Sequence, residues 1–208
     1  MVNMKRLWAM LLGFLLLSGG CINLKQPGNR IQFYDLEYEP PSIKGLVMLP
    51  YSLKVDRFHV TATYNTTQII YRDRSFKRDA YAYNRWRDNP GDIVTHFLNR
   101  DIRHSGLFRA VLPYDSGLKT SFTLTGTVDE FLEWDSGEDW NALLSISVIL
   151  IDNNEPDITK KILFQRSYSR KEACRQKDPR GLAEAMSLAM ARLSGEVIRD
   201  IHDHIAGH

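Results

Sequence analysis

Cysteine is scarce in this chain of 208 residues, which contains only Cys21 and Cys174. With only two cysteines, the chain cannot form the set of several disulfides that stabilises many small exported domains. Within the chain the two cysteines can pair only with each other, and such a disulfide is one interpretation. In the other interpretation Cys21 is chemically modified, and Cys174 is then a small, partly buried side chain rather than a nucleophile.

The motifs of the common enzyme classes are also missing. The chain has no Gly-x-Ser-x-Gly elbow, no phosphate-binding P-loop, no Gly-x-Gly-x-x-Gly turn and no His-Glu-x-x-His helix. His202 and His204 are two residues apart on a predicted helix and point to different faces, so with His208 we interpret them as a solvated C-terminus. His96 and His104 lie about 12 Å apart along another predicted helix. We therefore predict no enzyme activity, no metal and no cofactor.

Net charge is nearly absent. The formal charge is +2, and Lys5 and Arg6 account for it because the first 20 residues contain no acidic residue. Without those two, 25 basic residues remain against 25 acidic ones. This balance argues against a general nucleic-acid binder.

The apolar run at residues 7–17 is too short to span a bilayer. Its eleven residues would rise about 16 Å as a helix, whereas the hydrocarbon core is about 30 Å thick. Because Lys5 and Arg6 precede the run and small residues follow it, we interpret residues 1–20 as a cleavable export signal.

The signal ends in Leu17-Ser18-Gly19-Gly20-Cys21, which resembles a bacterial lipobox. We predict cleavage before Cys21 and lipidation of that cysteine, with an ordinary secretory signal as the alternative. Such lipoproteins carry more than one acyl chain, and each buried methylene contributes about 0.8 kcal/mol to anchoring. Ile22 rather than Asp follows the cysteine, which by analogy with sorting in Gram-negative bacteria favours the periplasmic face of the outer membrane.

The remaining chain is predicted to be one α+β domain, residues 31–208, behind a lipid anchor and tether at residues 21–30 that extends about 30 Å at most. Alternating apolar residues, turn residues and helix caps predict a mainly antiparallel sheet with two helices packed on one face. The expected strands cover 31–36, 45–49, 68–73, 79–83, 107–112, 122–134, 140–151 and 158–169, with a loosely extended segment at 58–64. The expected helices begin at Asn89-Pro90 and at Asp178-Pro179, and the second runs for about 26 residues.

The stretch from Tyr71 to Arg87 interleaves aromatic and basic side chains. Aromatic and Arg residues are enriched in the cores of protein interfaces. The alternative interpretation is a hairpin with aromatic cross-strand pairs and a basic outer face. Our candidates for a partner or oligomer interface are Tyr71, Arg72, Tyr81, Tyr83, Arg85 and Trp86.

Acidic residues also lie close to an aromatic residue at Trp134. Asp129, Glu130 and Glu133 would suit a carboxylate pair acting on a glycan. The simpler interpretation, which we prefer, is the solvent-exposed face of a strand.

Several short motifs together resemble one family, the ABC-type transport auxiliary lipoproteins, the family of PqiC. The motifs lie throughout the domain: Phe33-Tyr34-Asp35-Leu36, Tyr71-Arg72-Asp73, Tyr81-Ala82-Tyr83-Asn84-Arg85-Trp86, Pro90, Ser105-Gly106-Leu107-Phe108, Asp178-Pro179 and Ala185-Met186-Ser187.

This resemblance implies a non-enzymatic outer-membrane lipoprotein that works with an MCE-domain protein and an inner-membrane ABC transporter. Such systems move lipids between membranes and support envelope integrity. The resemblance also implies a homo-oligomeric ring at the outer membrane, with the residues around Tyr71 to Trp86 contacting sister subunits or the MCE partner. The alternative function is a lipoprotein activator of a peptidoglycan synthase.

Overall fold

The computed structural model describes residues 30–208 of the chain. The predicted export signal, Cys21 and the tether up to residue 29 lie outside the described residues. The described part folds as a nine-stranded sheet with two α-helices, which confirms the predicted α+β class. None of its helices is both long and apolar enough to cross a membrane.

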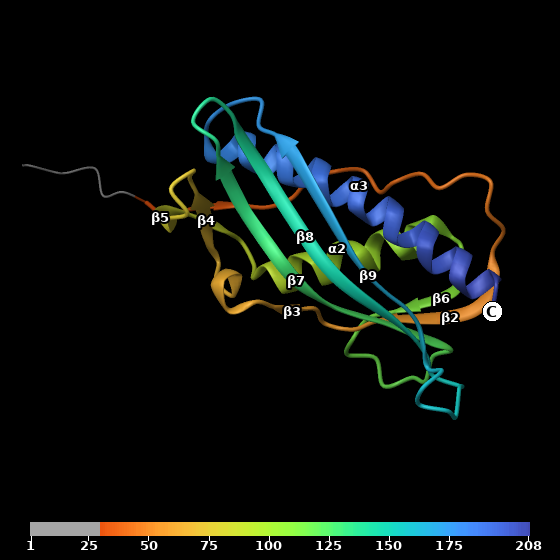
Figure 1. The fold of residues 1–208 in the computed structure, drawn as a ribbon. Helices are drawn as coiled ribbons and strands as arrows, with labels where there is room; N and C mark the ends of the chain where they lie inside the picture. Colours follow the sequence, from red (N-terminus) through yellow and green to blue (C-terminus); the bar gives the residue numbers. More distant parts are fainter. Residues whose placement is uncertain (1–29) are drawn as a thin grey trace, which may run out of the picture. The chain divides into compact units, whose positions relative to one another are not determined.

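Three long strands form the predicted antiparallel meander. β7 (Phe122–Asp135) pairs with β8 (Trp140–Asp152), and β8 pairs with β9 (Ile162–Ala173). Figure 1 shows these strands lying side by side along the length of the domain. The apolar residues of β8 point alternately to the two faces of the sheet, and those facing the helices, from Ala142 to Leu150, are fully buried.

The other edge of β7 is shared by three short strands, all parallel to it. β2 (Leu49–Val55), β3 (His59–Val60) and β4 (Gln68–Arg72) pair with it one after another. β4 turns back into β5 (Arg78–Trp86) as the predicted antiparallel hairpin. β1 (Gln32–Tyr34) joins β5, and β6 (Phe108–Leu112) joins β2, both in parallel. The longest ladders are thus antiparallel, as predicted, but the parallel pairings were not anticipated.

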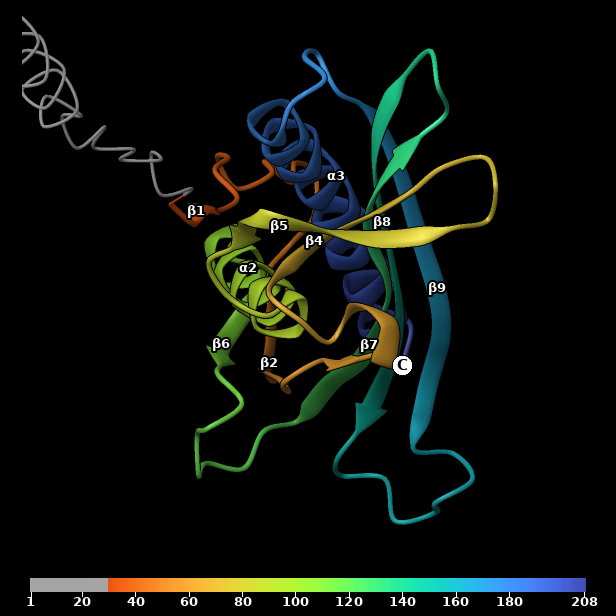
Figure 2. The same ribbon diagram turned by 90° about the vertical axis from the view of Figure 1, so that its left-hand side faces the viewer.

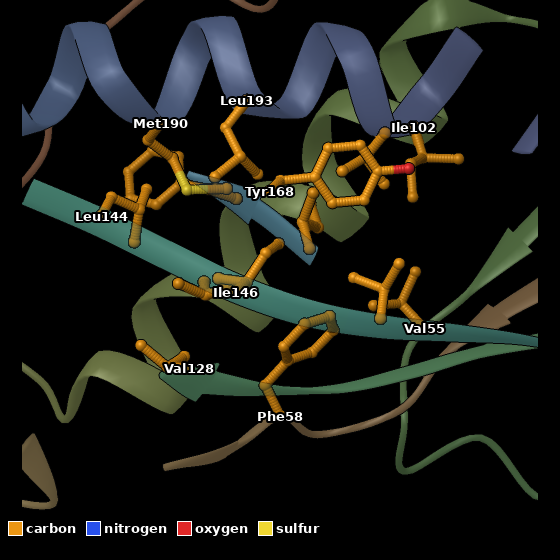
Figure 3. Close-up of a cluster of buried hydrophobic side chains, with 14 of the residues drawn as sticks. Val55, Phe58, Ile102, Val128, Leu144, Ile146, Tyr168, Met190 and Leu193 are labelled. Atoms are coloured by element: carbon orange, nitrogen blue, oxygen red, sulfur yellow. The ribbon is translucent and has the colours of Figure 1, made fainter. Parts of the chain in front are cut away.

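Both helices pack on one face of the sheet (Figure 2). α2 (Pro90–Ser105) begins at Asn89, whose side chain accepts a hydrogen bond from Gly91 N, and ends at Gly106 in the left-handed conformation. α3 (Pro179–Ala206) begins at Asp178 in the same way. Figure 3 shows Met190 and Leu193 of α3 directed at Leu144 and Ile146 of β8.

An extended segment, residues 35–48, crosses the outer side of the helices. Glu37 N donates to Ser187 Oγ (3.0 Å), and Tyr38 OH donates to the buried carboxylate of Asp101 (2.7 Å). Further along, His202 Nε2 lies 2.9 Å from the carbonyl oxygen of Val47. The helices therefore lie between the sheet and this segment, and His202 is buried rather than solvated as we predicted.

Two predicted strands are displaced. The strand expected at 45–49 and ending at Pro50 instead begins at Leu49, and Val47 and Met48 are exposed. The β2–β6 ladder is irregular between Leu49 and Ser52, which accommodates Pro50 inside the strand. The strand expected at 158–169 is β9, which begins only at Ile162.

Gly126 in β7 provides a test of the core. A Cβ at this position would lie 2.5 Å from Cε1 of Phe58 and would also overlap the carbonyl oxygen of Ser147. We expect Gly126→Ala to lower the free energy of unfolding by about 2 kcal/mol, because the pairing with β8 leaves little room for relaxation. Urea unfolding measures this. Gly117→Ala is the matched control, since a Cβ there meets no atom within 4 Å; equal effects of the two substitutions would contradict the assigned packing.

Candidate functional site

The candidate site is the hairpin formed by β4 and β5. The end of β4 pairs with the end of β7, with Tyr71 opposite Glu133 and Arg72 opposite Trp134. The far end of β5 pairs with β1, the first strand of the domain. Figure 2 shows the hairpin as a yellow arm projecting from the body of the domain. This location puts the predicted interface residues at the end of the domain where the described chain begins.

Trp86, at the end of β5, lies in the core. Its side chain is 1% exposed, and its ring meets Phe131 edge to face with centroids 5.1 Å apart. A side chain buried in this way cannot reach a partner directly. We therefore correct the predicted set and remove Trp86 from the candidate interface residues.

Tyr81 is also directed inward, onto a buried carboxyl group. Its hydroxyl donates a hydrogen bond of 2.9 Å to Oε2 of Glu133, which is 1% exposed. Burial raises the pKa of Glu133 to about 7, with a smaller upward contribution from Asp135, while the hydrogen bond from Tyr81 acts in the opposite direction. Tyr71 packs edge to face on Tyr81, with centroids 5.2 Å apart.

The location of Glu133 corrects a second prediction. Glu133 is not on a solvent-exposed face, as we had preferred. It is buried beneath Tyr81, whereas Glu130 is partly exposed and lies 3.9 Å from Arg72 Nη1. Glu130 and Glu133 are three residues apart, and because successive side chains of a strand alternate between the two faces of the sheet, they lie on opposite faces. The two carboxylates therefore do not form a pair that could act on a glycan.

The opposite face holds a cluster around Trp134. The guanidinium carbon of Arg72 lies 4.3 Å from the centroid of the Trp134 ring, and Lys171 Nζ lies 3.9 Å from it. Cations at this distance from an aromatic face are attracted by the ring quadrupole. Arg72 is thereby tied into the sheet, which reduces its availability to a partner.

Two aromatic side chains of the hairpin are exposed. Tyr83 in β5 is 47% exposed, and Phe76 in the turn is 93% exposed. Arg85 is half-buried. Of the predicted interface residues, Tyr83 is therefore the best placed to contact another molecule. Phe76 was not among the candidates, and the signal that could have identified it is its place in a polar turn between two predicted strands.

These features define a small α+β domain that carries aromatic and basic side chains on one projecting hairpin. The chain belongs to the family of ABC-type transport auxiliary lipoprotein components, whose family model matches residues 34–198. The resemblance inferred from the sequence is thus confirmed. Membership makes the chain a bacterial lipoprotein component of an ABC-type transport system.

Solved structures share the fold at low sequence identity. Protein XCC0632 from Xanthomonas campestris matches with a TM-score of 0.76 and 14% identity, over 85% of this chain and 97% of that one. An uncharacterized protein matches with a TM-score of 0.64 and 14% identity, over 83% and 99%. The hypothetical protein CT253 from Chlamydia trachomatis matches with a TM-score of 0.58 and 9% identity, over 77% and 100%. No curated protein sequence matches the chain significantly.

The buried carboxyl of Glu133 predicts a pH dependence of stability. Because the pKa is about 7 in the folded state and near its ordinary 4.5 in the unfolded state, the folded state binds the proton more tightly. Stability from this group is complete below pH 4.5 and falls as the pH rises to 7, by roughly 2–3 kcal/mol. We expect Glu133→Gln to remove this fall and to stabilise the protein at pH 8.

Urea unfolding at pH 5 and pH 8 makes the comparison. The control is Glu130→Gln, which changes a partly exposed carboxylate on the same strand and should leave the difference between the two pH values in place. An equal effect of Glu133→Gln at both pH values would show that the carboxyl group ionises as freely in the folded chain as in the unfolded one.

Proposed function

We propose that this chain is the outer-membrane lipoprotein of an intermembrane lipid-transport system, in which it docks an MCE-domain protein and its ABC transporter at the outer membrane. It performs this role without catalysing a reaction. The observation that carries the proposal is the family match over residues 34–198, directly behind a lipobox at Cys21. Ile22 after that cysteine supports the outer membrane as the destination.

The fold suits a docking subunit. The two helices pack on the long meander, and the hairpin carries the exposed Tyr83 two residues before the half-buried Arg85. Exposed aromatic residues next to Arg supply much of the binding energy in protein interfaces. We propose that this part of β5 contacts sister subunits of a homo-oligomeric ring or the MCE-domain partner.

Cys21→Ser tests the anchor. Without the acyl chains, the domain should leave the membrane fraction and fail to complement a deletion strain, while its thermal unfolding stays unchanged because the residue precedes the folded domain. Cell fractionation and immunoblotting measure the release. Cys174→Ser is the control and should stay in the membrane; a soluble Cys21→Ser protein that complements fully would count against the proposal.

Tyr83→Ala tests the protein contact. We expect several-fold weaker chemical cross-linking in cells, both between copies of the chain and to the partner, because the exposed ring is lost from the interface while the fold is retained. Tyr114→Ala is the matched control, since Tyr114 is 49% exposed on the β6–β7 loop. If Tyr83→Ala left the cross-links unchanged, the assignment of β5 to the interface would be wrong.

A further inference from the structure

The turn between β4 and β5 presents an unusual side chain. Phe76 is 93% exposed, and with φ of 65° it is the only residue other than glycine with a positive φ in the described range 30–208. A bulky side chain is disfavoured in the left-handed region. Here the strained residue gains no packing in return, and such a combination indicates a role beyond folding.

The turn is held in a fixed shape that presents Phe76 outward. Asp73 Oδ1 accepts hydrogen bonds from the backbone N–H and the hydroxyl of Ser75, at 2.8 and 2.5 Å. Asp73 N also donates to the carbonyl oxygen of Lys77. These hydrogen bonds of Asp73 hold the turn in one conformation, in which the ring of Phe76 faces away from the domain.

Basic side chains flank the exposed ring. Arg74, Lys77 and Arg78 are all exposed, and Lys77 lies 3.7 Å from Asp79. Asp73 is engaged in the turn. An apolar ring surrounded by Lys and Arg is the arrangement that side chains adopt at a bilayer surface, with the ring among the acyl chains and the cations at the phosphates.

The hairpin lies across one end of the domain (Figure 2). Its tip is next to the β7–β8 turn, because the end of β4 pairs with the end of β7, whereas β1 pairs with Asn84–Trp86 at the end of β5 remote from the tip. In that turn a Cβ at Gly137 would lie 3.8 Å from Arg74. Ile31 and Phe33, at the start of the domain, are themselves 47% and 55% exposed. The 13 residues of β8 separate this end from the β8–β9 loop by about 40 Å.

We propose that Phe76 and its basic neighbours contact the lipid bilayer that carries the Cys21 anchor, so that the domain is held at two points. The inference rests on the lipid anchor of the proposed function. The tether between Cys21 and the domain extends about 30 Å at most, which lets the end of the domain that holds β1 and the hairpin reach the lipid headgroups. The second contact fixes the orientation of the domain and directs the β8–β9 loop away from the membrane.

Site-specific fluorescence on the full-length lipidated chain tests this. In a Cys174→Ser background, Phe76→Cys is labelled with the environment-sensitive dye NBD, and the protein is reconstituted into vesicles of phosphatidylethanolamine and phosphatidylglycerol. Ile158→Cys is the matched control, because Ile158 is 80% exposed on the β8–β9 loop. Flotation first establishes attachment to the vesicles, and thermal unfolding establishes that both variants are folded. Nitroxide-labelled lipids then quench the dye where it touches the bilayer.

We expect a blue shift and loss of most of the emission at position 76, with little change at position 158. Floating protein with an unquenched dye at position 76 overturns the membrane contact but leaves the lipid anchor standing. Equal quenching at both positions overturns the fixed orientation. Protein that does not float overturns the anchor, and with it the two-point attachment that depends on it.

Discussion

Strand β7 pairs along both of its edges, and the positions of the other elements depend on this double pairing. One edge is taken by β8 over the whole strand, and the other is divided among β2, β3 and β4. β3 and the residues just before it fit between β7 and α2 because glycines face them on both sides. A Cβ at Gly126 of β7 would overlap the ring of Phe58, and a Cβ at Gly91 of α2 would overlap Phe58 O and Val60. Because β4 occupies the last part of this edge, its hairpin projects from one end of the domain.

The hairpin carries both buried and exposed side chains. Trp86 and Tyr81 of β5 are directed into the domain, where they meet Phe131 and Glu133. Tyr83 and the turn residue Phe76 are exposed. The inward residues hold the hairpin firmly, so that the outward ones are presented in a defined position.

Local signals in the sequence predicted most of the elements. The caps Asn89 and Asp178 located both helices, and the alternation of apolar residues located the meander. The pairing of strands that are distant in the sequence could not be predicted from local patterns. β2, β3 and β4 are short, and their parallel pairing with β7 depends on how distant segments of the chain meet. The burial of Trp86, Glu133 and His202 has the same origin, because Phe131, Tyr81 and the segment at Val47 reach them from elsewhere in the chain. The family resemblance, spread over many weak motifs, was predictable from the sequence, whereas the exposure of Phe76 was indicated only by its place in a polar turn.

The most direct test of the proposed docking function is to identify the proteins that lie next to this chain in the cell envelope. The chain is affinity-purified from outer-membrane fractions after mild cross-linking, and the attached proteins are identified by mass spectrometry. Docking in an intermembrane lipid-transport system predicts recovery of an MCE-domain protein together with ABC transporter subunits. Recovery of a penicillin-binding protein without any MCE-domain protein would contradict this and favour activation of a peptidoglycan synthase.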